Sequence, residues 1–277
     1  MVCKRLEAFV DRANKADADF IIQLGDLCYP TEENRILLRA LDRFAKPKYH
    51  LLGNHDMLNW LGMDRDYYSF ICKDVHFIKL DTNYIKHGDK VIPCSHRNNK
   101  IMKGEYPYLP EEQVAWLEKE IAESVYPIVI FSHHSLENSF RNRGIANRNT
   151  VQDIIARETQ KGKDILACMN GHDHADSVEK VDSILYITVN SISYKWFGFQ
   201  SYPFSEEIQA NYPDLPDIIL HEQPLSSLIV IHDNNDIEIQ GMEGGYQDHF
   251  SPSALGIHAW DGRAVSASIQ SRRLIYS

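Results

Sequence analysis

Polar and apolar residues alternate along the chain with two periods, one typical of helices and one of strands. Apolar residues at helical spacing predict an amphipathic helix over residues 4–14, and a buried strand is expected at 20–24. A second helix, with Ile36 on its apolar stripe, is predicted to end at Pro47, and a strand then leads into Gly53. This strand–helix–strand order predicts parallel pairing in a layered α/β domain.

Further elements are predicted in the middle of the chain. Residues 67–71 and 75–80 predict a hairpin, whereas residues 81–109 lack periodicity and are expected to form one long loop. A proline followed by two acids predicts the start of a helix at Pro110, and another helix is expected over residues 150–159. Each of these two helices is followed by a hydrophobic run that ends in histidines.

The C-terminal part has weaker patterns. One hairpin is predicted to turn at Asp182 and Ser183, and a last hairpin covers residues 225–241. Residues 190–224 are rich in aromatic residues and proline without a period, which predicts a lid or rim. Because the chain shows no repeat, low-complexity tract or linker, we expect a single domain over residues 1–277.

Composition narrows the function classes. The chain has 277 residues, 43% hydrophobic and 25% charged, which is typical of a globular protein with a substantial core. Its net charge of −10 argues against a large nucleic-acid-binding surface, although bound metal cations can still attract an anionic substrate. No apolar run approaches the roughly 18 residues that a membrane span needs, so no membrane association is expected.

The five cysteines are odd in number and scattered, and none of them form a pair at zinc-site spacing. The first residues predict a helix rather than a signal peptide. We therefore expect mostly reduced cysteines and a cytoplasmic protein.

Four hydrophobic runs end in polar residues that can bind metal. These ends are Gly25-Asp26, Gly53-Asn54-His55-Asp56, His133-His134 and Gly171-His172-Asp173-His174. A lone Gly-Asp is usually only a turn with a side-chain hydrogen bond, but four such ends in one chain favour a shared site. A glycine lets the backbone turn tightly and present these side chains at one sheet edge.

The ligand types in these clusters are carboxylate, amide oxygen and imidazole, without a thiolate. This set suits Mn, Fe, Zn or Co rather than a structural thiolate zinc site. Two such ions close together would bind a phosphoryl oxygen and activate a water.

The order Gly-Asp, Gly-Asn-His-Asp, strand-His and Gly-His-x-His resembles calcineurin-like metallophosphoesterases over about residues 20–189. The segments IKLDTN (78–83) and LPEEQVAWLEKEI (109–121) are similar to connecting elements of that family. The resemblance implies a four-layer α/β/β/α sandwich of two mixed sheets flanked by helices. Residues 190–277 would supply a rim or lid and the C-terminal hairpin.

The resemblance also implies roles for individual residues. Asp26 would bridge two metal ions, with Asn54, His133 and His172 on the second ion and His174 on the first. His55 would act near the leaving-group oxygen as a general acid or electrostatic stabiliser, with Asp56 orienting its imidazole.

Two positions, His134 and Tyr29, have two possible roles each. His134 would lie behind the metal ligands or face the substrate. Tyr29, in GDLCY, matches the GDxxY form that resembles purple acid phosphatases, where the tyrosine binds iron; the alternative is a packing tyrosine at the rim.

One feature departs from the family pattern. The family begins with a strand that ends in Asp-x-His or Asp-x-Gly and supplies ligands to the first metal, whereas only Met1, Val2 and Cys3 precede the first predicted helix. We therefore expect the first strand to be missing, either by truncation of a complete enzyme or by loss of the first metal site. A truncated N-terminus would also leave room for a signal peptide.

Candidate substrate contacts lie in three segments. They are the loop that carries His87, His96, Arg97 and Lys100, the loop that carries Arg141, Arg143 and Arg148, and an aromatic group, Tyr194, Trp196, Phe197 and Phe199. Arginines and a stacking rim favour a phosphodiester or nucleotide over inorganic phosphate, whereas a solvated charge run and an aromatic mini-core are the alternatives.

We thus predict a metal-dependent phosphoesterase acting on a phosphodiester, nucleotide or phosphomonoester through a metal-activated water. The alternative is a binding protein of the same fold with an incomplete first metal site, and a phosphoprotein phosphatase is a weaker third option. The expected partner is a phosphorylated small molecule or nucleotide, and no oligomeric state is predicted.

Overall fold

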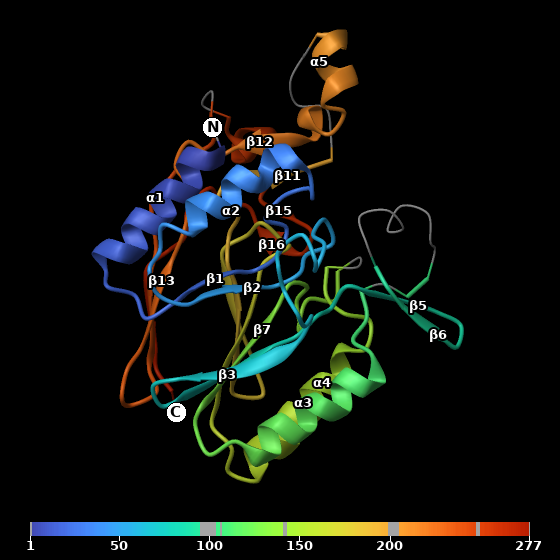
Figure 1. Cartoon of the computed structure of the whole chain (residues 1–277), viewed down its shortest axis with the longest axis vertical. Coiled ribbons are helices and arrows are strands. Elements are labelled where there is room, and N and C mark those ends of the chain that lie inside the picture. Colours follow the sequence, from blue (N-terminus) through green and yellow to red (C-terminus); the bar gives the residue numbers. More distant parts are fainter. Residues whose placement is uncertain are drawn as a thin grey trace.

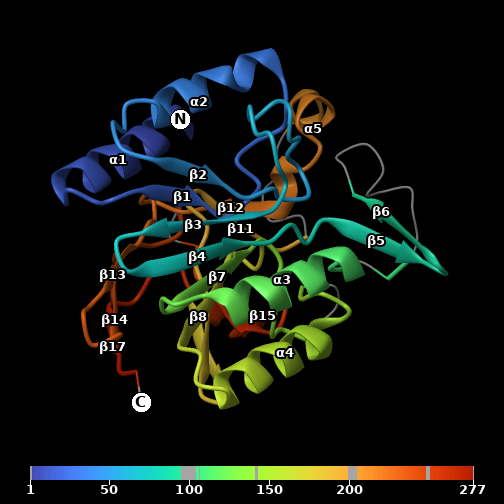
Figure 2. The ribbon, with the colours of Figure 1, turned by 60° about the horizontal axis from the view of Figure 1, so that its bottom comes forward.

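The protein is a four-layered α/β structure (Figures 1 and 2). The computed structural model describes residues 2–94, 104–105, 107–140, 143–198, 205–247 and 250–276. Helices form the two outer layers and β-strands form the two inner layers. The predicted α/β architecture is therefore confirmed.

A six-stranded mixed sheet forms the centre of the molecule. Its strands, in spatial order, are β3 (Tyr68–Cys72), β4 (Val75–Lys79), β7 (Ile128–Ser132), β8 (Ile165–Asn170), β10 (Ile184–Thr188) and β9 (Ser177–Val181). Strands β4, β7, β8 and β10 are parallel, while β3 and β9 lie antiparallel at the two edges. The two predicted hairpins, β3–β4 and β9–β10, are confirmed.

Helices α3 (Glu111–Glu123) and α4 (Arg148–Gln160) cover one face of this sheet. Pro110 precedes α3, as predicted, and two acids occupy the first turn, where the helix dipole favours them. Leu117 and Ile121 of α3 and Ile155 of α4 are buried against Ile130 of β7. Burial of these apolar side chains holds the helices on the sheet.

Two smaller sheets cover the other face. Strands β1 (Ile21–Gln23) and β2 (Lys48–His50) pair in parallel, as predicted, and β13 (Leu228–Ile231), β14 (Ile237–Gln240) and β17 (Arg272–Leu274) pair antiparallel. Both groups share an apolar core with the central sheet, formed by residues such as Leu51, Phe77, Val129 and Ile239. The second inner layer is thus built from two separately hydrogen-bonded sheets.

Helices α1 (Val2–Lys15) and α2 (Arg35–Leu41, preceded by the short helix η1, Glu32–Asn34) form the outer layer over β1. The prediction that α2 continues to Pro47 is wrong, because the chain turns after Leu41 and Phe44 is buried from this turn. Ile36 is 45% exposed, so it does not belong to the buried stripe.

Two arginines tie α1 to the C-terminal part of the chain. The Arg12 guanidinium donates to the carbonyls of Gln240 (2.7 Å) and Gly241 (3.0 Å), and also to that of Ser226. The Arg5 guanidinium donates to the carbonyl of Gln223 (2.9 Å). The first helix therefore contacts the backbone of residues more than 200 positions later in the sequence.

Residues 81–109 are not one irregular loop as predicted. Strands β5 (Tyr84–His87) and β6 (Lys90–Pro93) form a hairpin that turns at Gly88, whose φ is 59°. A bridge joins Lys86 to Glu105, and Ile85 is buried. Strands of four residues are too short to give a visible period, which explains the wrong prediction.

Regular structure also occurs in 190–224 and in the tail. These elements are β11 (Tyr194–Trp196), α5 (Glu206–Asn211), η2 (Leu215–Asp217), β12 (Ile218–Leu220), η4 (Pro252–Leu255), β15 (Ala259–Trp260) and β16 (Arg263–Ala264). Strands β11 and β12 pair antiparallel, and α5 protrudes from the main body (Figure 1).

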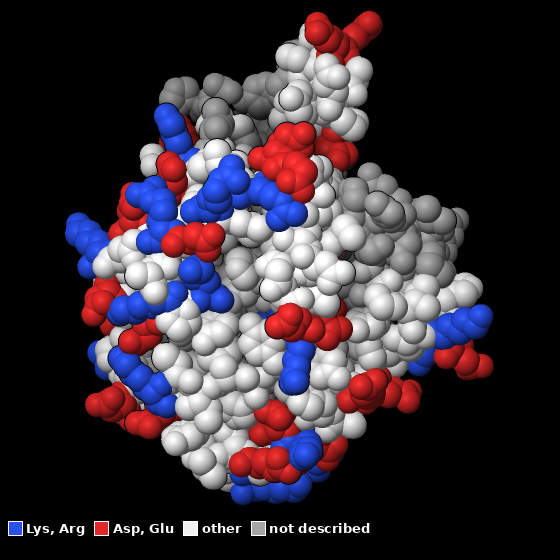
Figure 3. All heavy atoms as spheres, viewed as in Figure 1, with Lys and Arg blue, Asp and Glu red and all other residues white. Residues whose placement is uncertain are grey.

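The described residues also show the distribution of surface charge, the state of the cysteines and the length of the helices. On the face shown in Figure 3, Lys and Arg side chains over α1 and α2 are interspersed with Asp and Glu, as in the ion pairs Arg43–Asp11 (3.0 Å) and Lys46–Asp17 (2.6 Å). All five cysteines are free thiols. Within the described ranges, every helix is too short or too polar to cross a membrane.

Candidate metal centre

Two tight turns after β1 and β2 bring the first candidate ligands together. Gly25 has a φ of 96° and Asp26 a φ of 58°, so the chain reverses direction directly after β1. A Cβ atom on Gly25 would lie 2.2 Å from His133 Nδ1, and one on Gly53 would lie 2.1 Å from Asp26 Oδ1. Only glycine fits at these two positions, because the backbone passes so close to ligand side chains.

Asp56 and Asp26 lock the two turns together. Asp56 Oδ2 accepts hydrogen bonds from the backbone N–H of Asp26 (2.7 Å) and of Gly53 (2.9 Å). Asp26 Oδ1 accepts one from the N–H of His55 (2.9 Å). Burial, reinforced by the charge of Asp26, raises the pKa of Asp56 to about 7. The structure thus places Asp56 beneath the site, with backbone groups as its partners.

His133, after β7, presents one ring nitrogen to the site. Its Nδ1 is 2.7 Å from the carbonyl oxygen of Leu24, which can only accept, so Nδ1 carries the proton. In the neutral ring the lone pair therefore lies on Nε2. This Nε2 is 3.3 Å from Asp26 Oδ2, 3.3 Å from Asn54 Oδ1 and 3.1 Å from His172 Nδ1.

These four residues form a cluster of electron-pair donors. A carboxylate oxygen, an amide oxygen and two imidazole nitrogens converge from the ends of β1, β2, β7 and β8. Burial lowers the pKa of His172 well below its usual value and so favours the neutral ring that binds metal. Burial opposes ionisation of Asp26, but His133 and His55 hold its pKa below the usual range. Such a donor set fits a divalent cation.

His134 lies beside this cluster. Ligand nitrogens of His133, His134 and His172 all fall within 4.8 Å of one another. His134 is fully buried, and its Nδ1 is 3.0 Å from the Thr82 hydroxyl. The structure therefore places it in the histidine group, on the side of the central sheet.

His174 occupies a separate position at the same strand end. Its φ is 45°, and its ring centroid lies 4.8 Å from that of Tyr194. Within the described part of the chain, its buried Nδ1 has no hydrogen-bond partner. A buried nitrogen of this kind is available to a metal ion, as the resemblance implies for the first site.

A buried polar network holds the turn that carries His172 and His174. Asp173 is fully buried and accepts from Arg143 Nε (3.1 Å) and Asn138 Nδ2 (3.0 Å). The Arg143 guanidinium also donates to the His172 carbonyl (2.5 Å), and Lys195 Nζ donates to the Asp173 carbonyl (2.7 Å). Sequence reasoning assigned no role to Asp173, although its place between two candidate ligands was a usable signal.

One of the arginines predicted to contact substrate, Arg143, belongs to this network. Arg143 directs its Nε at Asp173, behind the histidines, where it holds the turn. Arg148 begins α4. Arg141 lies outside the described residues, as do His96, Arg97 and Lys100.

Tyr29 lies at the rim. Its ring packs edge-on to His55 with centroids 5.1 Å apart, and its hydroxyl is 3.4 Å from Asp214 Oδ2. Burial, followed by the charge of Asp214, raises the pKa of Tyr29 and favours the neutral phenol.

The predicted aromatic rim is only partly present. Trp196 is 38% exposed, but Phe197 is buried with Ile219 and Tyr246. A substrate contact by Phe197 is therefore wrong, and the alternative of an aromatic mini-core holds for it. Phe199 lies outside the described residues.

Solved structures of other proteins have a similar fold. The chain is similar in fold to a dimetal phosphatase from Danio rerio, with 14% identity, a TM-score of 0.58 and coverage of 99% of this chain and 89% of that one. It is also similar to GAP50, the anchor in the inner membrane complex of Plasmodium, with 14% identity, a TM-score of 0.52 and coverage of 99% and 83%. No curated protein sequence matches significantly. The family model of calcineurin-like phosphoesterase matches residues 3–176, and the chain therefore belongs to that family.

Proposed function

We propose that this protein hydrolyses a phosphoester at a dinuclear metal site and prefers a phosphodiester or nucleotide to a phosphomonoester. The observation that carries the proposal is the convergence of Asp26, Asn54 and His172 on the lone pair of His133 Nε2. A carboxylate oxygen, an amide oxygen and two imidazole nitrogens around one point make a donor set that suits a cation, which supports a metal-binding role.

Asp26, Asn54, His133 and His172 would hold one ion, and Asp26 with His174 would contribute to a second. A bound cation supplies positive charge for a phosphoryl oxygen and lowers the pKa of water. His55 is fixed beside Asp26 by its backbone N–H, which suits a role near the leaving-group oxygen.

The rim favours a substrate of low negative charge. Asp214 contacts the Tyr29 hydroxyl, and the Tyr29 ring packs against His55, so a carboxylate lies one side chain away from the proposed acid. Repulsion by this carboxylate penalises a doubly charged monoester more than a singly charged diester. This contrast supports the diester preference.

The test measures bound metal and hydrolysis of bis-p-nitrophenyl and p-nitrophenyl phosphate with added Mn. We expect His133→Asn to lose metal and activity together, whereas His232→Asn, at a partly exposed site on the C-terminal hairpin, retains both. Asp214→Asn is expected to raise monoester turnover relative to diester turnover. An unchanged ratio would contradict the diester argument.

A second candidate is a binding protein of this fold with an incomplete first site, since the resemblance assigns only Asp26 and His174 to that ion. Stable binding of a single metal without hydrolysis of either compound would favour this candidate over the enzyme.

A further inference from the structure

Strand β3 is an edge strand of the central sheet. It pairs with β4 on one side, and no strand in the described part of the chain pairs with its other side. An edge strand presents backbone N–H and C=O groups that can bind another extended chain.

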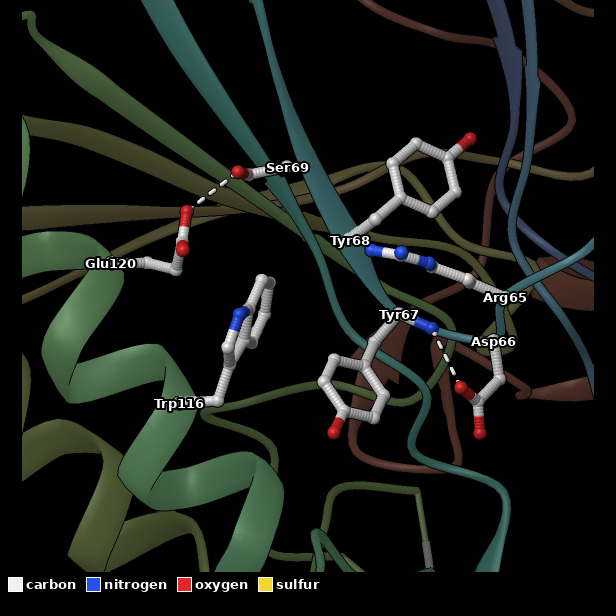
Figure 4. A pocket seen from close by; sticks show the side chains of 7 residues that line it. All are labelled: Arg65, Asp66, Tyr67, Tyr68, Ser69, Trp116 and Glu120. Carbon is white, nitrogen blue, oxygen red and sulfur yellow. Dashed lines mark hydrogen bonds between the residues drawn. The ribbon is translucent and has the colours of Figure 1, made fainter.

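A hollow of about 430 Å³ lies along this edge (Figure 4). It is lined by residues 65–69 and by Trp116 and Glu120 of α3. Successive strand residues point to opposite faces, and β3 ends the sheet, so a hollow that touches both Tyr68 and Ser69 is accessible from the outer edge of β3. Its position is therefore suited to a chain that runs alongside this strand.

The side of the hollow that faces α3 is aromatic and acidic. The rings of Tyr67 and Trp116 lie 4.9 Å apart, tilted by 60°, and form a partly exposed wall. Glu120 accepts a hydrogen bond from the Ser69 hydroxyl (2.5 Å), and Asp66 lies at the end of the strand (Figure 4). Arg65 also lines the hollow, so it is the aromatic wall together with Glu120, rather than the net charge, that favours an ammonium or guanidinium group here.

A second, smaller hollow of about 140 Å³ continues along the same edge. Ile71, 57% exposed, and Val125, 85% exposed, line it, and Glu120 borders both hollows. Ser69 and Ile71 are two residues apart and lie on one face. Side chains two apart in an added strand would therefore reach the two hollows.

We propose that β3 binds an extended segment of a partner protein as an added antiparallel strand. The segment carries an aliphatic residue two positions before a Lys or Arg, which enter the smaller and the larger hollow respectively. A second copy of this chain fits poorly, because a two-fold contact would bring Glu120 and Glu123 of both copies together.

The test measures binding of a short labelled peptide with a Val-Thr-Lys core to the full chain by fluorescence anisotropy. Glu120→Gln keeps the hydrogen bond to Ser69 but removes the charge, and we expect about tenfold weaker binding. Replacing the peptide lysine with alanine is expected to weaken binding by the same factor. The two changes together are expected to weaken binding no more than either change alone. Glu243→Gln, an exposed acid elsewhere on the chain, is the matched control.

Three results would overturn the proposal. Equal losses from Glu120→Gln and Glu243→Gln would indicate nonspecific charge attraction. Undiminished binding of a peptide whose core valine and lysine are N-methylated, which lacks the N–H donors opposite Ile71 and Ser69, would exclude strand pairing. Self-association that Ile71→Lys abolishes would identify a second copy as the occupant.

Discussion

At the scale of single residues, the site depends on groups that bind no metal themselves. Gly25 and Gly53 leave space for ligand side chains that any Cβ atom would occupy. Asp56 joins two turns through backbone hydrogen bonds, and Asp173 fixes a third turn through Arg143. These contacts set the geometry of the candidate ligands.

The role of Asp173 can be measured directly. Asp173→Asn removes the charge that holds Arg143, so the turn with His172 and His174 loosens, and we expect metal affinity to fall roughly 10–100-fold. Asp236→Asn is the matched control, because Asp236 is also buried and pairs with Arg273 (3.2 Å) on the C-terminal hairpin. Titration with Mn followed by calorimetry gives both affinities. Equal losses would show that the network serves stability alone.

At the scale of elements, the parallel strands made the convergence of the candidate metal ligands predictable. The carboxyl ends of β1 and β2 and of β7 and β8 meet at one edge, so polar residues that follow each strand were expected to converge. Asp26, Asn54, His133 and His172 are indeed within contact distance. The contact of His134 with Thr82 joins residues 52 positions apart, and that of Arg143 with Asp173 joins residues 30 apart. No local pattern encodes such pairs.

The burial of apolar residues on helices was predicted less accurately than the position of the polar residues that follow strands. Apolar spacing marked both Ile36 and Leu117 as buried, but Ile36 is 45% exposed and Leu117 fully buried. Periodicity indicates which residues share a face, whereas the neighbouring elements decide how much of that face is covered.

This difference in burial predicts that truncating the two side chains lowers the free energy of unfolding by unequal amounts. Leu117→Ala removes a side chain between α3 and the central sheet and is expected to lower the free energy of unfolding by about 2–5 kcal/mol. Ile36→Ala, at an exposed site, is expected to cost less than about 1 kcal/mol. Urea denaturation of the two variants gives the comparison. Similar costs would show that α2 is more tightly packed than its exposure indicates.

At the scale of the whole molecule, buried neutral histidines make stability depend on pH. His221 is fully buried, and burial lowers its pKa to about 3, while burial lowers that of His50 to about 4. The unfolded chain takes up a proton at each histidine near its ordinary pKa of about 6.5, whereas the folded chain does not. Stability from these groups is therefore complete above that pH and decreases as the pH falls.

At His221 the unfolded chain binds one proton more than the folded chain between roughly pH 6 and pH 4. The free energy of unfolding therefore changes by about 1.4 kcal/mol per pH unit in this range. The variant His221→Gln lacks the titrating group at this position. As the pH falls, its free energy of unfolding is therefore expected to decrease less steeply than that of the wild type, by the same amount per pH unit. Urea denaturation at pH 7, 6 and 5 measures the difference, with His232→Gln at a partly exposed site as the control. Parallel slopes for wild type and His221→Gln would contradict a buried neutral ring.

The hydrogen bonds from α1 to the C-terminal strands have a consequence for biosynthesis. Arg5 and Arg12 emerge from the ribosome near the beginning of translation, but the carbonyls of Gln223, Gln240 and Gly241 that accept from them emerge over 200 residues later. Until then the two arginines lack these partners, whereas the apolar face of α1 can already pack on β1 and α2. Nascent chains of this protein are therefore expected to pack α1, β1 and α2 first and to fix α1 to the C-terminal strands only when synthesis is complete.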